Sequence, residues 1–214
     1  IKLDVTDKVK GNNSIILNTG YDNNNKDAYL LTIDQNKITI QGATQSGVFY
    51  GVQTLRKTIP AKKDIDKVNF QPVNITDYPR FSYRGMHLDV CRHMFPTDSI
   101  KKYIDILALH NINRFHWHLS DDQGWRIEIK KYPELTQIGS MREQTVIGRN
   151  SGEYDGKPYG GFYTQDEIKD VIKYAENRFI TIIPEIDLPG HMLAALTTYP
   201  NLGCTGGPYK VAES

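Results

Sequence analysis

The stretch RFHWHLSDD, residues 114–122, decides the fold of this chain, because an apolar segment runs directly into two carboxylates, Asp121 and Asp122. A second apolar stretch, PEIDLPGH (184–191), follows about seventy residues later and ends in Asp187 and His191. Buried carboxylates and imidazoles are costly unless they are paired, so a fold that places them at strand ends commonly uses them for chemistry. We therefore expect both stretches to end at one pocket.

Composition narrows the function classes. The chain has 214 residues, 39% of them hydrophobic, which is enough for one sizeable core or two modest ones. Lys and Arg number 26 against 25 for Asp and Glu, and this balance predicts neither a nucleic-acid nor a membrane partner. No apolar stretch reaches the roughly 18 residues of a membrane span, and a start at Ile1 without Met or a signal peptide indicates a trimmed beginning. Only two cysteines are present, and Cys91 is expected to be a structural thiol.

The first 78 residues predict a small α+β domain. Residues 28–33 and 37–41 are β-rich and are joined by a short polar turn, which indicates a hairpin. Ser46 is expected to cap a helix that stops before Pro60, and an extended connector with two prolines follows at 71–79. This region holds no cluster of His, Asp or Glu, so it is expected to be a packing module.

From residue 79 onward, strands and helices alternate. Strands are predicted over 86–91, 113–119 and 179–186, and helices are predicted to begin at Thr97 and, with a capping box, at Thr164. Such alternation predicts parallel strands with right-handed crossovers, whose ligands bind outside the carboxyl ends. Because a (β/α)8 barrel takes about 250 residues, these elements predict its opening part, with an active-site loop between 124 and 161.

Three kinds of chemistry fit the polar residues. His116 and His118 would point to one side of a strand and could hold a metal with Asp121, although same-facing histidines in a barrel are more often hydrogen-bonded lumen residues. A glycosidase would use the carboxylates as its working groups. A carbohydrate-binding fragment without catalysis is the third possibility, and a metal-dependent barrel hydrolase using His116 and His118 stays an alternative.

Three ordered motifs carry a resemblance to a known family. RGMHLDVCRH (84–93), FHWHLSDDQGW (115–125) and PEIDLPGH (184–191) closely resemble the β-N-acetylhexosaminidases of glycoside hydrolase family 20. The resemblance implies an α/β fold, the opening strands and helices of a (β/α)8 TIM barrel (79–214), preceded by a small α+β domain (1–78). It also implies hydrolysis of terminal, non-reducing β-linked N-acetylglucosamine or N-acetylgalactosamine from glycans by a substrate-assisted, retaining mechanism, with no cofactor and no metal.

The resemblance assigns roles to individual residues. The residues implied to support the catalytic general acid are Asp121, His191 and Asp187, the last through His191. The residues implied to bind the substrate or to surround it are Arg84, Asp122 and His118. Arg84 would donate hydrogen bonds to sugar hydroxyls with its forked guanidinium.

The family's catalytic Asp-Glu pair follows two glycines after the fourth strand, and the chain reaches Ser214 before such a strand. The one local Asp-Glu pair, Asp166 and Glu167, fits the capping box of a helix instead. The chain alone is therefore expected to be inactive. Open strand edges would favour self-association or association with the remaining part of the parent chain. Because enzymes of this family are commonly exported, a secreted or periplasmic location is expected.

Overall fold

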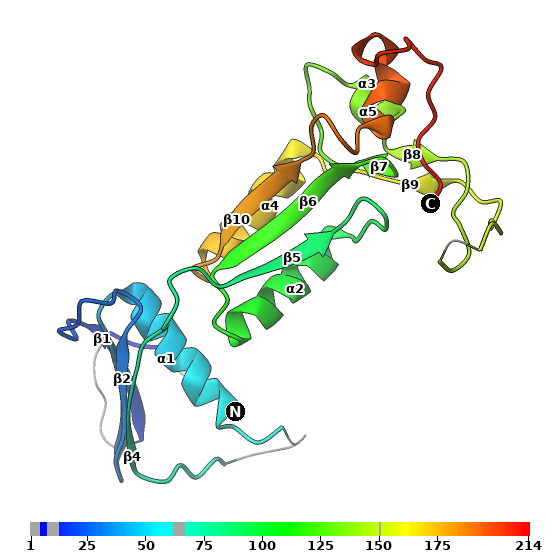
Figure 1. Ribbon diagram of the computed structural model, residues 1–214. Helices are drawn as coiled ribbons and strands as arrows, with labels where there is room; N and C mark the ends of the chain where they lie inside the picture. Colours follow the sequence, from blue (N-terminus) through cyan, green and yellow to red (C-terminus); the bar gives the residue numbers. More distant parts are fainter. Residues whose placement is uncertain (1–4, 8–12, 62–66, 150) are drawn as a thin grey trace. The chain divides into compact units, whose positions relative to one another are not determined.

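The computed structural model describes residues 5–7, 13–61, 67–149 and 151–214 (Figure 1). The chain divides into two compact units. The first comprises residues 1–84 with 108–111, and the second comprises residues 85–107 and 112–214. No helix in the described part of the chain is both long and apolar enough to cross a membrane.

The first unit contains a four-stranded sheet in the order β1-β3-β2-β4. Its strands are β1 (Ser14–Thr19), β2 (Tyr29–Ile33), β3 (Lys37–Gly42) and β4 (Val73–Asp77). The predicted hairpin is confirmed as the antiparallel pair β2–β3, whereas β1 and β4 were not predicted as strands. The segment expected to be a connector contains β4, because its extended backbone pairs antiparallel with β2.

The helix of the first unit, α1 (Gln45–Lys57), packs on this sheet. The helix is capped by Thr44 rather than by the predicted Ser46, since the Thr44 side chain accepts a hydrogen bond from the Ser46 backbone N–H. The Ser46 hydroxyl instead donates to Asp27 at 2.6 Å. A Cβ at Gly51 would lie 2.4 Å from Ile40, so the helix approaches β3 closely only because residue 51 is a glycine.

The second unit contains three parallel strands in the order β10-β6-β5. They are β5 (Gly85–Asp89), β6 (Arg114–Asp121) and β10 (Thr181–Ile186). The three predicted strands are confirmed, although β5 ends at Asp89 rather than at Cys91. Its end has a local cause, because the Asp89 carboxylate accepts hydrogen bonds from the backbone N–H groups of Cys91 and Arg92 and so forms a turn.

Two helices, α2 (Thr97–Leu109) and α4 (Gln165–Glu176), lie beside these strands (Figure 1). The alternating residues Phe115, Trp117 and Leu119 of β6 are buried, and Phe115 contacts Tyr103 of α2 at a centroid distance of 5.5 Å. Period-two geometry places His116 and His118 on the opposite face of the sheet. The capping box predicted at Thr164 is confirmed.

Short elements follow the carboxyl ends of β6 and β10. Between β6 and α4 lie β7 (Gly124–Trp125), α3 (Glu134–Gln137), β8 (Met141–Arg142) and β9 (Tyr159–Gly160), and after β10 come α5 (Leu193–Thr198) and the 3-10 turn η1 (Pro200–Leu202). Figure 1 shows α3 and α5 side by side beyond the ends of β6 and β10. Trp125 packs there in a small core and donates its indole N–H to the Ile127 carbonyl at 2.7 Å. These elements form a layer of loops around the carboxyl ends.

Candidate active site

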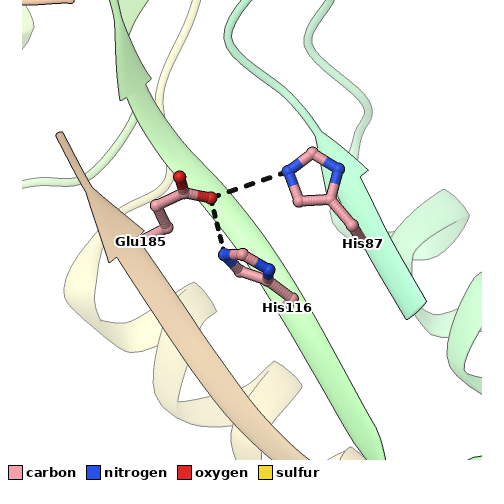
Figure 2. A group of neighbouring side chains, drawn as sticks. All are labelled: His87, His116 and Glu185. Atoms are coloured by element: carbon pink, nitrogen blue, oxygen red, sulfur yellow. Dashed lines mark ion pairs between the residues drawn. The ribbon is translucent and has the colours of Figure 1, made fainter. Parts of the chain in front are cut away.

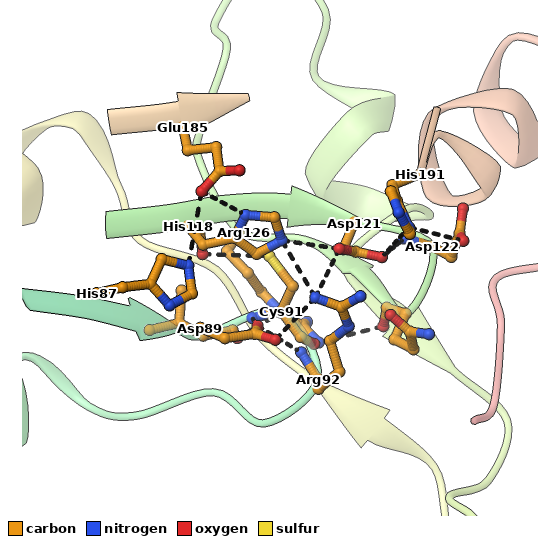
Figure 3. A network of polar contacts seen from close by, with 12 residues as sticks. His87, Asp89, Cys91, Arg92, His118, Asp121, Asp122, Arg126, Glu185 and His191 are labelled. Atoms are coloured by element: carbon orange, nitrogen blue, oxygen red, sulfur yellow. Dashed lines mark hydrogen bonds and ion pairs between the residues drawn. The ribbon is translucent and has the colours of Figure 1, made fainter. Parts of the chain in front are cut away.

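A buried carboxylate, Asp121, is the centre of the polar network at the end of β6 (Figure 3). Its side chain is 1% exposed, and one carboxyl oxygen lies 2.7 Å from both Arg92 Nη1 and His118 Nε2. The other oxygen lies 3.2 Å from His191 Nδ1 and accepts a hydrogen bond from the Asp122 backbone at 2.7 Å. The partners come from three segments that follow or end β5, β6 and β10. Asp121 therefore connects the carboxyl ends of all three strands.

The second stretch singled out in the sequence brings His191 to this carboxylate. His191 has a φ of 55°, a left-handed conformation that is uncommon for a residue with a side chain. Asp122 holds the same turn, since one of its oxygens accepts the Leu193 N–H at 3.0 Å and the other lies 3.3 Å from His191 Nδ1. The His191 side chain is 54% exposed, so it is fixed at one nitrogen and accessible to a ligand.

His118 lies deeper and is held at both ring nitrogens. It is 4% exposed, with Nε2 facing Asp121 and Nδ1 2.9 Å from Glu185 of β10. Burial alone would lower the pKa of His118, but the hydrogen bonds to Asp121 and Glu185 outweigh burial and raise it. Burial would likewise raise the pKa of Glu185, yet the contact with His118 lowers it. Charged imidazolium and carboxylate forms thus stabilise each other.

Arg92 belongs to the polar network around Asp121, although no role was assigned to it from the sequence. It follows β5, its side chain is 42% exposed, and it contacts Asp89 at 2.8 Å as well as Asp121. Burial would raise the pKa of Asp89, but backbone N–H groups and the charge of Arg92 lower it. The direction of the strand before Arg92 was the signal that could have identified it, because residues that follow a parallel strand lie at the end where ligands bind.

Arg84 precedes Gly85, the first residue of β5, and therefore belongs to the strand end opposite to Asp89 and Arg92. Its guanidinium donates hydrogen bonds to the carbonyls of Asn111 (2.7 Å) and Phe81 (2.8 Å), and it lies 3.6 Å from Asp27. These partners all belong to the first unit. Arg84 was expected to share a pocket with Asp121 and His191, but the structure places it before the amino end of β5, whereas Asp121 lies at the carboxyl end of β6.

Asp187 lies near the end of β10 with Glu185 and His118. Its backbone N–H donates to Ser120 Oγ at 3.1 Å, and a hydrogen bond involving its side chain helps to lower the pKa of Glu185. His191 is held by Asp121 and Asp122. Direct support of His191 by Asp187 stays a prediction.

A buried guanidinium fixes the loops beneath the network. Arg126 is 0% exposed and donates five hydrogen bonds to backbone carbonyls. The acceptors are Val90, Cys91, Gln123, Ser140 and Gly161. Arg142 adds hydrogen bonds to the carbonyls of Arg92 and Gln123. The two arginines therefore hold the segment that carries Arg92 against the segment that follows Asp121.

Three parallel strands with helices beside them and a polar network at their carboxyl ends are the arrangement expected of the opening part of an α/β barrel. Comparison with protein families agrees with this arrangement. Residues 81–214 match the catalytic domain of glycosyl hydrolase family 20, and residues 1–78 match domain 2 of the same family. The chain belongs to glycosyl hydrolase family 20, and the predicted fold, a small domain before the opening part of a (β/α)8 barrel, is confirmed.

Similar proteins are hexosaminidases. A Beta-hexosaminidase of Porphyromonas gingivalis is 48% identical over 190 residues, which is 86% of this chain and 23% of the relative, and one of Vibrio furnissii is 44% identical over 81% of this chain and 28% of the relative. The solved β-N-acetylhexosaminidase of Streptomyces coelicolor is 36% identical with a TM-score of 0.81, covering 96% of this chain and 40% of that chain. This chain therefore spans about a quarter of the length of the curated relatives named here.

Proposed function

We propose that this chain is the part of a β-N-acetylhexosaminidase that supports the general acid during removal of terminal, non-reducing N-acetylhexosamine from glycans. The observation that carries the proposal is the pair Asp121–His191, in which a buried carboxylate holds the inner nitrogen of a half-exposed imidazole. The names of the relatives support the substrate class. An exported location is part of the same proposal and rests on the family resemblance.

The pair would act through the second imidazole nitrogen. With Nδ1 held between Asp121 and Asp122, the His191 ring is oriented, and Nε2 would hydrogen-bond the carboxylic acid that protonates the leaving oxygen. Asp121 and His191 are therefore positioning residues in this proposal.

Sugar hydroxyls would be bound by Arg92 rather than by Arg84. Arg92 lies at the carboxyl end of β5, is partly exposed and is oriented by two carboxylates, Asp89 and Asp121. A guanidinium fixed in this way can present its remaining N–H groups to two neighbouring hydroxyls. Asp122 and His118 would contribute indirectly, Asp122 by holding the His191 turn and His118 by fixing Asp121.

Asp166 and Glu167 do not fit the role of the proton donor. The Glu167 carboxylate accepts hydrogen bonds from the backbone and the hydroxyl of Thr164 at the start of α4. The side-chain contacts of Asp166 and Glu167 are with Lys169 and Thr164 of the same helix start, not with the network around Asp121. We therefore expect the 214-residue chain by itself not to release nitrophenol from nitrophenyl N-acetyl-β-glucosaminide.

A chimera tests the proposal. The chain replaces the matching segment of the Porphyromonas gingivalis relative, and hydrolysis is measured for the chimera, its Asp121→Asn variant and its Arg92→Met variant. Asp121→Asn is expected to lower kcat by about 10²-fold, because the imidazole loses its charged partner. Arg92→Met is expected to raise KM as well as to lower kcat, since ground-state contacts to the sugar are lost too.

Asp166→Asn in the same chimera is the control, because Asp166 lies on the exposed first turn of α4 and is expected to leave kcat and KM within about twofold. An active chimera whose kcat is unchanged by Asp121→Asn would refute the role of the Asp121–His191 pair. Replacing Arg84 with Met gives the deciding comparison for sugar binding: a larger KM effect than for Arg92→Met would return that role to Arg84.

A further inference from the structure

The face of the three-stranded sheet that carries His118 also carries a second set of ligand-type side chains. His87 of β5, His116 of β6 and Glu185 of β10 each come from a different strand, and Figure 2 shows the two imidazoles turned toward the same carboxylate. Glu185 Oε2 lies 2.6 Å from His116 Nε2 and 3.6 Å from His87 Nε2. One ligand atom from each residue lies within 4.8 Å of the other two.

We propose that His87, His116 and Glu185 form a binding site for one divalent transition-metal ion of the zinc class. The chemistry of the set favours such an ion, because two imidazoles with one carboxylate suit zinc, cobalt, nickel or copper, whereas magnesium and calcium prefer oxygen ligands alone. The proposal does not depend on the proposed glycosidase activity.

The distances are close to those that a shared ion requires. With bond lengths of about 2.1 Å, tetrahedral ligands lie roughly 3.4 Å apart. The separation of 3.6 Å between His87 Nε2 and Glu185 Oε2 is near this value, while the ion pair between His116 Nε2 and Glu185 Oε2, at 2.6 Å, must open by roughly 0.8 Å. A rotation of the His116 ring provides this opening, since its side chain is 38% exposed.

The scaffold keeps the ligands in place and accessible. His87 and His116 are direct neighbours in the β5–β6 register, and their rings meet edge to face at 4.8 Å. Strand positions hold ligands more accurately than loops do. Within this 214-residue chain, His87 and Glu185 are 48% and 28% exposed, so an ion added to the chain can enter and water can take a fourth position, as in open zinc sites.

The site differs from the His116–His118 pair considered from the sequence. His118 is buried, with Asp121 at Nε2, and its Nδ1 lies 2.9 Å from Glu185 Oε2, the same oxygen that faces His116 and His87, so it supports this carboxylate instead of joining the ligands. Such a contact to a ligating carboxylate is the usual support of a metal site. The proposal concerns binding of the ion only and gives it no role in hydrolysis.

Zinc and cobalt titrations of the 214-residue chain test the proposal. After treatment with a chelator, the wild-type chain is expected to bind one Zn²⁺ by calorimetry, and Co²⁺ in its place is expected to give visible d–d absorption. His87→Leu and His116→Leu are each expected to weaken binding by about tenfold or more, because each removes one of three ligands. The matched control is His110→Leu, at an exposed histidine outside the set, which is expected to bind as the wild type does.

Other outcomes would overturn the proposal. The proposal fails if the wild-type chain binds no zinc, or if binding is unchanged in both His87→Leu and His116→Leu. It also fails if His191→Leu abolishes binding and His87→Leu does not, because the ion would then lie at Asp121, Asp122 and His191. A variant-free measurement guards against misfolding: ¹⁵N NMR of the wild-type imidazoles should show zinc-dependent shifts at Nε2 of His87 and His116. Shifts confined to other histidines would contradict the site.

Discussion

At the scale of single residues, one carboxylate determines how the site is charged. Asp121 is buried with Arg92, His118 and His191 around it, and breaking a buried charge pair costs more than an exposed one because the remaining partner keeps no compensating charge. His118 transmits this arrangement to Glu185. The ionisation of His118 is therefore the most direct readout of the network.

Replacing Glu185 with Gln should lower the pKa of His118. In the native chain that pKa is raised above its ordinary value of 6.5, so the stability contributed by His118 is fully present below about pH 6.5 and is lost as the pH rises through the raised pKa. The Gln variant loses one of the two carboxylate partners. Titration of the His118 ring by NMR in chelator-treated buffer measures both forms, and Glu143→Gln, at a side chain that is 78% exposed, is the control.

An unchanged His118 pKa in the Glu185→Gln variant would show that Asp121 alone sets its charge. The free energy of unfolding as a function of pH gives a second check. It should fall less steeply above neutral pH in the variant than in the wild type, since the variant has less of this stabilisation to lose.

At the scale of elements, the loop layer depends on one glycine. A Cβ at Gly124 of β7 would lie 2.3 Å from the Arg126 guanidinium, whose five carbonyl partners prevent it from moving aside. We expect Gly124→Ala to lower the free energy of unfolding by about 1–3 kcal/mol. Chemical denaturation measures the change, and Gly190→Ala, with nothing within 4 Å of its added Cβ, should cost much less. Equal costs would mean that Arg126 can repack.

Much of the element pattern could be predicted from the sequence, and the exceptions have physical causes. The strand β6 was predictable because its alternation of apolar and polar residues matches a sheet with one face on helices. The strand β4 was not, since pairing with β2, more than thirty residues away, decides its state rather than its own residues.

The same holds for the site. Asp121 and His191 could be predicted because they end apolar stretches, and the structure brings them to 3.2 Å. The choice of Arg92 over Arg84 could also have been made, because the predicted strand over 86–91 already places Arg84 before its amino end and Arg92 after its carboxyl end. The approach of Glu185 to three histidines depends on the parallel register of three strands, which no local pattern reveals.

At the scale of the whole molecule, each of the two units has buried residues of its own. Leu31 is fully buried in the core of the first unit, and Leu119 is 1% exposed in β6 of the second. Leu31→Ala is expected to cost about 2–5 kcal/mol of local stability, as is Leu119→Ala. Hydrogen exchange followed by mass spectrometry should show loss of protection in the first unit for Leu31→Ala and in the second for Leu119→Ala. Loss spread over both units in either variant would show that they unfold as one.

The two cysteines differ in exposure, so their rates of chemical labelling report on local opening of the structure. Cys204 is exposed, whereas Cys91 is 0% exposed, its thiol donates to the His118 carbonyl at 3.3 Å, and burial raises its pKa. A thiol-reactive dye should therefore label Cys204 at once and Cys91 only during rare openings of the layer around Arg92 and His118. The rate of the slow labelling of Cys91 therefore measures how often this layer opens, in the native sequence and without any substrate.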